Sequence, residues 1–381
     1  MGSRRGATGW EKNPPPRSIE FSSFFREYNS RATRTTTMKM RVHRAVVFIA
    51  LICISVQTTT TTTTTTRFVH ASGVTNLPSN EIFLDSICKC LKEDPKDGDC
   101  ASFATSTGYG TMPFWMTRDI TNMAYAFDFE RLVSSGPLGC NLTEIEALRF
   151  NADLKYWDTS HVTNFDFMFR RAKSFDGKGL KFWDVGNAET LRGMFQETAE
   201  FDDNIAFWDI RNAIDLSKLF LNAEKFSQPI GFWDVSNVET AFAMFEGARR
   251  FNEDISTWNW ASIFSGSNPS NSCKKKKKKR MRALLQQQTD NEGEYFLRLC
   301  GEEIGLKQMF KNAPRFNGDV STWKGEATRY EQENMFEGSD SFNAKWKCKT
   351  EFDGPTETCK ERAETEIREE ISEIREFFRS T

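Results

Sequence analysis

The chain has 381 residues, and its 51 Lys plus Arg nearly balance 53 Asp plus Glu, which gives a formal charge of −2. It contains 34 Phe and 10 Trp but only 3 His, and hydrophobic residues make up 38% of it, so aromatic rings must supply most of any core. The scarcity of His disfavours His-based triads, His metal clusters and His acid–base catalysis, and the balanced charge gives no general reason to expect nucleic-acid binding.

The first segment, residues 1–71, is a basic leader. A basic stretch at 38–44 precedes a twelve-residue apolar run from Ala45 to Val56, and a Thr-rich run follows. This order is typical of a secretory signal, whereas a membrane-spanning helix needs about 20 apolar residues. We therefore expect cleavage after Ala71 and a secreted or cell-surface protein that meets the membrane only through this leader.

The next segment, 72–148, is a Cys-containing flank. Eight cysteines follow the leader and none lies between residues 141 and 272, as expected for disulfides at the two ends of an elongated body. The Cys-x-Cys at 88–90 also fits metal binding, but no His or second close Cys pair completes a zinc pattern, and no metal site is predicted. Asn141 opens an N-glycosylation sequon. The pairing stays open, and the possible disulfide partners are Cys88, Cys90, Cys100, Cys140, Cys348 and Cys359.

A repeat of 25 or 26 residues occupies 149–263 and resumes at 304–347, and Trp115 begins a degenerate first unit in the preceding flank. Trp-Asp pairs recur at steps of 26, 25 and 25 residues, and a Phe stands twelve residues after each of these Trp. The signature residues are Trp157, Asp158 and Phe169, then Trp183, Asp184 and Phe195, then Trp208, Asp209 and Phe220, then Trp233, Asp234 and Phe245, then Trp258, Phe310 and Trp323.

Each unit predicts a short helix and then a short extended segment that ends at the next Trp. Val162, Phe165, Phe169 and Ala172 step by three or four residues, which places them on one apolar helix face. One unit cannot bury its Trp, Met and two Phe alone, so stacked neighbours are expected to build a continuous aromatic core. The expected fold is an α/β repeat solenoid.

These units resemble those of the BspA-like surface proteins, whose repeat reads approximately F-N-x-D-I-S-x-W-D-V-S-N-V-T-x-M-x-x-M-F-x-x-A. Residues 251–258 match the first half of this pattern, and residues 232–238 and 243–248 match the second half. The resemblance implies a leucine-rich-repeat-like solenoid that is usually secreted or surface-anchored. It also implies roles in adhesion or protein binding, and it carries no catalytic motif.

Two further segments lie outside the repeat pattern. The insertion at 264–303 is basic and of low complexity, and we interpret it as disordered or as a retained intron; a nuclear signal or a polyanion-binding patch is the alternative. The last segment, 348–381, combines a Cys-containing flank with an amphipathic helix that caps the open end of the stack or mediates self-association.

The repeated columns favour structure over chemistry. The aromatic columns fit a ligand-binding stripe, but their one-per-repeat recurrence favours core packing. The Asp column fits calcium ligands, but a repeated turn acceptor is favoured, since no calcium loop with several oxygen ligands within about a dozen residues is evident. We therefore predict no catalytic, cofactor-binding or metal residues and no cofactor.

The function predicted from these features is a non-enzymatic, secreted or cell-surface repeat protein. It is expected to bind extracellular proteins or surface glycans in an adhesion-like role, and not nucleic acid. One alternative is an intracellular protein-interaction scaffold whose leader is not a signal. A carbohydrate-active enzyme is a third possibility, and it would need a pocket with paired carboxylates.

Overall fold

The computed structural model describes residues 75–136, 139–263, 305–325, 328, 332–350 and 353–363. The chain divides into two compact units, 1–70 and 71–381, and all described residues belong to the second. The predicted signal, the insertion at 264–303 and the helix predicted after residue 363 lie outside the described residues. Within those residues, no helix combines the length and hydropathy needed to cross a bilayer.

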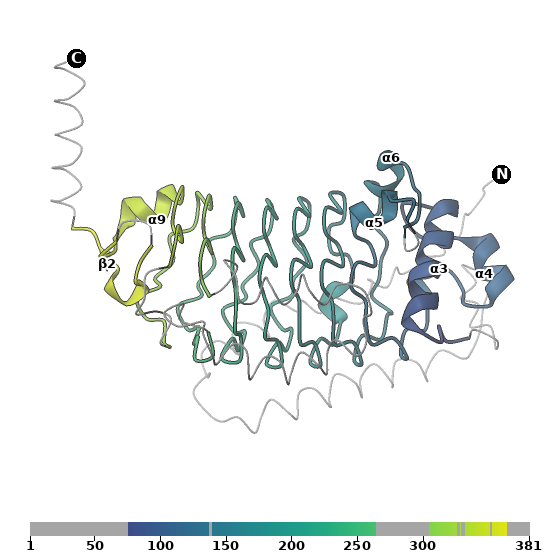
Figure 1. Cartoon of the computed structure of the whole chain (residues 1–381), viewed down its shortest axis with the longest axis horizontal. Coiled ribbons are helices and arrows are strands. Elements are labelled where there is room, and N and C mark those ends of the chain that lie inside the picture. The colour runs from purple at the N-terminus through teal and green to yellow at the C-terminus, as the bar shows by residue number, and fades with distance from the viewer. Residues whose placement is uncertain are drawn as a thin grey trace, which may run out of the picture. The chain divides into compact units, whose positions relative to one another are not determined.

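Regular secondary structure is concentrated at the two ends of the second unit (Figure 1). A single pair of antiparallel strands, β1 (Trp346–Lys347) and β2 (Lys360–Glu361), lies near the end of the described chain. The helices are α3 (Asn80–Glu93), α4 (Ala101–Thr107), α5 (Phe129–Val133), α6 (Glu144–Ala147) and α9 (Asp340–Lys345), with 3-10 turns η1 (Met112–Phe114), η2 (Leu180–Phe182) and η4 (Thr356–Thr358).

Each repeat unit forms one coil, and we name each coil by its Trp. In the first five coils, the residue seven positions after the Trp forms a parallel bridge with the equivalent residue of the next coil. Figure 1 shows the coils side by side in a row. The bridging residues are Asn122, Asn164, Thr190, Asp215, Thr240 and Gly305.

The core of the row is a continuous stack of aromatic rings. Phe169, Phe195, Phe220 and Phe245 are fully buried, and successive ring centroids lie 5.8, 5.9 and 5.5 Å apart. A single coil leaves both faces of such a ring open, so each coil needs a neighbour on either side.

The buried Trp of each coil also links it to the preceding coil. The indole Nε1 of Trp183 donates to the carbonyl of Leu154 at 2.9 Å, and that of Trp208 donates to the carbonyl of Leu180 at 3.0 Å. The same bond recurs in the later coils, for example from Trp233 at 3.2 Å. A buried indole needs an acceptor, and the ladder provides one for Trp157, Trp183, Trp208, Trp233, Trp258 and Trp323.

The short helix predicted in each unit is absent from the described coils, so this prediction was wrong. The N–H groups of Phe165, Phe167 and Phe169 donate at 2.8–3.0 Å to carbonyls of the next coil, not to carbonyls one helical turn back. Phe167 has a φ of 53°, which an α-helix excludes. The equivalent residue of each coil is also left-handed, and the set is Tyr125, Phe167, Gly193, Lys218, Ala243, Gln308 and Asn334.

The segment before each Trp also differs from the extended segment that the sequence predicts. The N–H of Trp183 donates to the carbonyl of Leu180, and that of Trp233 donates to the carbonyl of Ile230, each at 3.0 Å. These three-residue bonds close tight turns, and the Trp that follows has extended backbone angles, with φ −70° and ψ 139° at Trp183. The apolar spacing therefore reflects a coil that turns repeatedly, not a helix followed by a strand.

The coils continue in register across the insertion. The N–H of Ala241 donates to the carbonyl of Gly305 at 2.9 Å, and the rings of Phe245 and Phe310 stack at 5.6 Å. Gly305 follows Trp258 by 47 positions, whereas the bridging residue follows the Trp by seven in the earlier coils. The added 40 residues therefore lie between the Trp and the bridge of one coil, as the repeat spacing predicts.

The N-terminal end of the row is covered by α3. Ser79 caps this helix by accepting the N–H of Ile82 at 3.2 Å. The ring of Phe83 packs edge-on against Trp157 at 5.4 Å and against Trp115 at 6.5 Å. Helix α3 thus covers the ring of Trp115, which has no further coil beside it, and also reaches Trp157 of the next coil.

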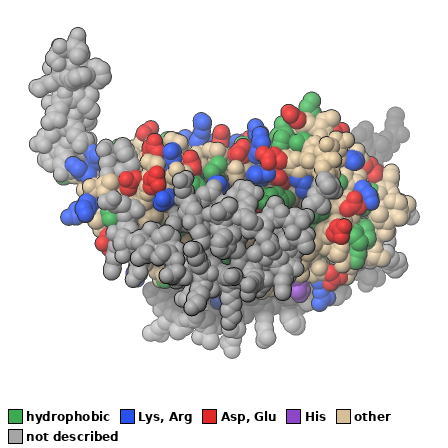
Figure 2. Space-filling view, viewed as in Figure 1, with side chains coloured by type: hydrophobic (Ala, Val, Ile, Leu, Met, Phe, Trp, Pro, Cys, Tyr) green, Lys and Arg blue, Asp and Glu red, His purple; other side chains and the backbone are tan. Residues whose placement is uncertain are grey.

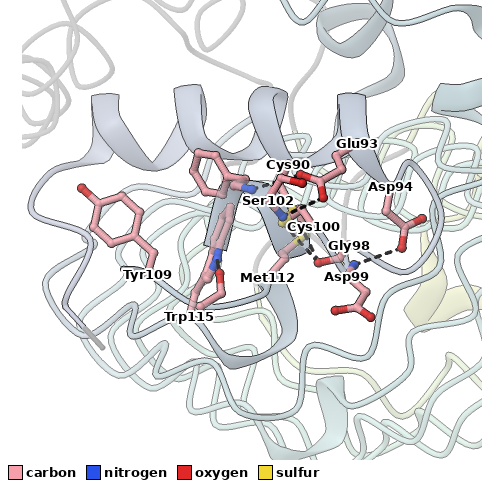
Figure 3. Close-up of a disulfide and its surroundings, with 12 residues drawn as sticks. Cys90, Glu93, Asp94, Gly98, Asp99, Cys100, Ser102, Tyr109, Met112 and Trp115 are labelled. Carbon is pink, nitrogen blue, oxygen red and sulfur yellow. Dashed lines mark hydrogen bonds between the residues drawn. A yellow bond between two sulfur atoms is a disulfide. The ribbon is translucent and has the colours of Figure 1, made fainter. Parts of the chain in front are cut away.

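The six predicted cysteines pair as three disulfides, Cys88–Cys140, Cys90–Cys100 and Cys348–Cys359. Figure 3 shows the Cys90–Cys100 bond joining α3 to the start of α4. Beside it, the carboxylate of Glu93 accepts the N–H of Ser102 at 2.8 Å and so caps α4 from α3. Both ends of the row therefore carry cross-links.

Candidate functional site

The backbone of each coil sends the two neighbours of its Trp to the opposite side from the Trp itself. Trp183 has extended backbone angles and is buried, so the side chains before and after it point the other way. Phe182 and Asp184 are accordingly exposed. Repetition of this geometry along the row produces two outward columns, one aromatic and one acidic.

The aromatic column is the largest exposed apolar feature that recurs in the coils. We call it the aromatic ridge. Its side chains are 52–85% exposed, whereas the stacked Phe side chains of the core are fully buried. Phe207 and Phe232 are the most exposed, at 85% each. The ridge consists of Phe114, Tyr156, Phe182, Phe207 and Phe232, and Thr257 and Thr322 take the equivalent places in the later coils.

The acidic column serves as a turn acceptor in the four coils that carry it. Asp184 Oδ1 accepts the N–H of Gly186 at 2.9 Å, and Asp234 Oδ1 accepts the N–H of Ser236 at 3.1 Å. Asp158 and Asp209 make the same bond two residues onward. In the part of the chain that the structure describes, no group of three or more His, Cys, Asp or Glu could hold a metal ion.

Two lysines already occupy rings of the ridge. The Nζ of Lys155 lies 4.7 Å from the centre of the Tyr156 ring, and that of Lys181 lies 5.3 Å from the centre of the Phe182 ring. Both distances are those of a cation–π contact. At the two most exposed rings, the residue in the position of the lysine is Ala206 or Gly231.

An arginine occupies one carboxylate of the acidic column. The guanidinium of Arg211 donates to Asp209 through Nε at 2.8 Å and through Nη2 at 2.5 Å. This bond to Asp209 raises the pKa of Arg211, and the nearby charge of Asp234 acts in the same direction. Among the described residues, Asp158, Asp184 and Asp234 have no cation within 4 Å.

A different edge of the coils neutralises its own charge. Arg249 pairs with Glu224 at 3.9 Å, and Lys311 pairs with Glu337 at 2.8 Å, each bond joining neighbouring coils. Figure 2 shows acidic and basic side chains interspersed along the edge that carries α5 and α9. Exposed pairs of this kind contribute little stability, but they balance the charge of this edge.

A shallow groove of about 380 Å³ crosses three coils beside the Trp-Asp turns. The amides of Asn187 and Asn212 donate to carbonyls of the preceding coil at 2.6 and 2.7 Å, so they hold coils together. The hydroxyl of Thr163 likewise donates to the carbonyl of Thr121 at 3.4 Å. Its lining is His161, Thr163, Asn187, Glu189, Asn212 and Ile214.

The interior of the first coils holds charged groups that are paired within the protein. Arg170 donates to both oxygens of Asp128, at 2.8 and 2.9 Å, and Asp166 accepts the hydroxyl of Thr190. Burial, reinforced by the negative charge of Asp215, raises the pKa of Asp166 to about 7. Burial also raises the pKa of Asp128, against the effect of its bond to Arg170.

The residues singled out from the sequence thus have three structural roles: they form the core, close turns or make disulfides. The signature Trp and Phe are buried in the stack, the signature Asp accept turn N–H groups, and the cysteines are paired. Asn141 is exposed, and its glycosylation stays a prediction. The aromatic ridge was missed, although a Phe or Tyr before the Trp in five coils is a visible signal.

Comparison with known proteins identifies a family through its repeated segments. The family model described as "Mycoplasma protein of unknown function, DUF285" matches residues 103–179, 176–283 and 303–353, together more than half of the chain. No curated protein and no solved structure matched the chain. The three matches include the coils described above, and the chain therefore belongs to this DUF285 family of repeat proteins.

Proposed function

We propose that this protein is a non-enzymatic, BspA-like solenoid that is exported and binds another macromolecule along the aromatic ridge. The observation that carries the proposal is the register of the ridge, since five coils expose an aromatic side chain at the same position. Exposed aromatic area is unfavourable in water by about 25 cal/mol per Å², and a contiguous apolar patch commonly marks an interaction site.

The arrangement of the other conspicuous residues supports binding over catalysis. The acidic column is engaged in turns, the buried acids are paired with Arg170 or Thr190, and the groove amides hold adjacent coils together. The ridge, in contrast, leaves 52–85% of each of its aromatic side chains exposed to solvent. A rigid row of aromatic anchors is the kind of surface on which interface hot spots concentrate.

Three disulfides support the exported location, because such bonds persist in oxidising compartments. N-terminal sequencing and non-reducing mass spectrometry of the protein purified from its natural source test this part of the proposal. We expect a mature chain that begins near residue 72 and contains all three bonds. An intact leader together with free thiols would instead support the intracellular scaffold.

Binding is tested on immobilised arrays of random peptides and of glycans, probed with the full-length protein. Wild type is expected to bind a subset of one array, and the triple variant Phe182→Ser, Phe207→Ser, Phe232→Ser is expected to lose that binding. Ile145→Ser is the matched control, because Ile145 is 74% exposed on α6, outside the ridge. Equal binding by wild type and the triple variant, or no binding by wild type, would refute the proposal.

A further inference from the structure

The aromatic ridge has two halves that differ in their access to cations. One half runs from Phe114 to Phe182, and the other, which we call the open half, consists of Phe207 and Phe232. In the Trp157 and Trp183 coils, Lys155 and Lys181 place an ammonium group over the exposed ring. In the Trp208 and Trp233 coils, Phe207 and Phe232 follow Ala206 and Gly231, which carry no charge. These two rings are also the most exposed of the ridge, so their faces are open to a cation from outside.

The carboxylates beside the open rings complete the recognition of a cation. In an extended backbone, side chains two residues apart point to the same face and lie about 6.5–7 Å apart, so Asp234 stands next to Phe232 across the buried Trp233. Asp209, next to Phe207, already holds the guanidinium of Arg211 through both its oxygens. An aromatic ring and a carboxylate at this separation can hold one Lys or Arg side chain between them.

The charge of the surrounding coils favours the same class of partner. Residues 75–263 contain 18 Lys and Arg against 29 Asp and Glu, a formal charge of −11. A surface of this sign accelerates encounters with cationic partners and repels acidic ones. The cations already seated on the surface, Lys155, Lys181 and Arg211, show which groups its rings and carboxylates accept.

We propose that the open half of the ridge, Phe207 and Phe232 together with Asp234, binds a Lys- and Arg-rich peptide segment of another protein. This inference rests on the proposed binding function and names its partner class. Adjacent coils are about 5 Å apart, so a short segment with two or three basic side chains reaches both rings. The side chains of the segment repeat the contacts that Lys181 and Arg211 make within the protein.

The test is fluorescence anisotropy of three labelled decapeptides with the full-length protein. In the first peptide Lys and Arg alternate with Gly, in the second Gln replaces every basic residue, and in the third Glu does. We expect the basic peptide to bind, the Gln peptide to bind at least roughly tenfold more weakly, and the Glu peptide not to bind. Raising NaCl from 50 to 500 mM is expected to weaken the basic complex several-fold.

Two sets of variants separate specific docking from general attraction between opposite charges. Phe207→Ser with Phe232→Ser is expected to weaken the basic peptide roughly tenfold at unchanged thermal stability. Lys181→Ala uncovers the Phe182 ring and is expected to tighten binding of the basic peptide. Lys178→Ala is its control, because it removes the same charge from an exposed position of the same coil. The affinity of Lys181→Ala should exceed that of Lys178→Ala several-fold.

The outcomes also distinguish this inference from the proposed function. Basic-peptide binding that is unaffected by the double Phe variant, or equal effects of the two Lys variants, would show attraction by charge alone and overturn the inference. A ridge-dependent array ligand that is a neutral glycan, with no binding of the basic peptide, would overturn it while leaving the proposed function intact. Loss of every ridge-dependent signal would remove both.

Discussion

The middle coils and the N-terminal end bury their aromatic rings by different means. In the middle, each stacked Phe is covered by the equivalent ring of the coils on both sides, and residues 141–272 contain no cysteine. At the end, α3 replaces the missing coil, and the Cys88–Cys140 and Cys90–Cys100 disulfides fasten it. Cross-links therefore occur where stacking stops, because a terminal coil has only one neighbour to cover it.

The largest expected effect comes from breaking the stack in its middle. Phe220 is fully buried and stacks on Phe195, Phe226 and Phe245, so Phe220→Ala is expected to lower the free energy of unfolding by about 3–5 kcal/mol. Phe207→Ala in the same unit removes an exposed ring and is expected to change it by less than about 0.5 kcal/mol. Urea unfolding of the two variants measures both values. Similar losses in both would contradict the division between core and ridge.

Removing an end cross-link is expected to have the next largest effect. The Cys88→Ser, Cys140→Ser variant opens a 52-residue loop and is expected to lose about 2–4 kcal/mol. The Cys348→Ser, Cys359→Ser variant opens an 11-residue loop and should lose about 1 kcal/mol less. Hydrogen exchange should show the loss of protection in α3 for the first variant, with the coils around Phe220 still protected. Uniform loss along the row would mean that the end and the middle unfold as one.

The pH dependence of stability tests the buried acid of the middle coils. The pKa of Asp166 is raised from 3.8 to about 7, so the folded state holds this proton more tightly than the unfolded chain. The contribution of Asp166 to the free energy of unfolding is therefore fully present below pH 3.8 and is lost as the pH rises towards 7. In Asp166→Asn, the amide oxygen can still accept the hydroxyl of Thr190. The wild-type free energy of unfolding is expected to fall by roughly 2 kcal/mol between pH 5 and 7, and this fall should be absent from the variant.

Unfolding free energies measured from pH 4 to 8 check this change. Asp254→Asn is the control, because bonds from Ser256 lower the pKa of Asp254 and its titration falls below this window. The control should therefore keep the wild-type slope between pH 5 and 7. A wild-type slope in Asp166→Asn would show that another group is responsible.

Deleting residues 264–303 is expected to have the smallest effect. The deletion would place Gly305 seven positions after Trp258, as in the other coils, and the shorter connection should stabilise the fold by about 1–2 kcal/mol. Deleting only residues 264–283 should stabilise the fold by less than about 1 kcal/mol. Thermal and urea unfolding measure both changes. A destabilised deletion would mean that the insertion contributes contacts to the coils.

The repeat could be predicted from the sequence because each buried ring recurs at a constant step. Trp183, Trp208 and Trp233 are 25 residues apart, and stacking requires such regularity. The local backbone could not be predicted in the same way. Spacings of three or four residues, as between Phe165 and Phe169, are shared by helices and by coils that turn every few residues, and the bonds to the neighbouring coil decide between them.

The ridge illustrates the same limit for the candidate site. Phe207 and Trp208 are adjacent aromatic residues, and composition alone assigns both to the core. The extended backbone at the Trp sends them to opposite sides, so one is buried and the other is 85% exposed. The sequence therefore shows that a Phe precedes the Trp, but not that the side chain of this Phe points towards solvent.

The sequence by itself determined the period of the repeat, the residues that stack and the register across the insertion, because these depend on spacing along the chain. The tertiary structure decided what spacing leaves undetermined. Hydrogen bonds between coils replaced the predicted helices, the cysteines were paired across the N-terminal end, and Phe207 and Phe232 were turned towards solvent. Each of these depends on which groups of neighbouring coils meet in space, and residues far apart in the chain supply the partners.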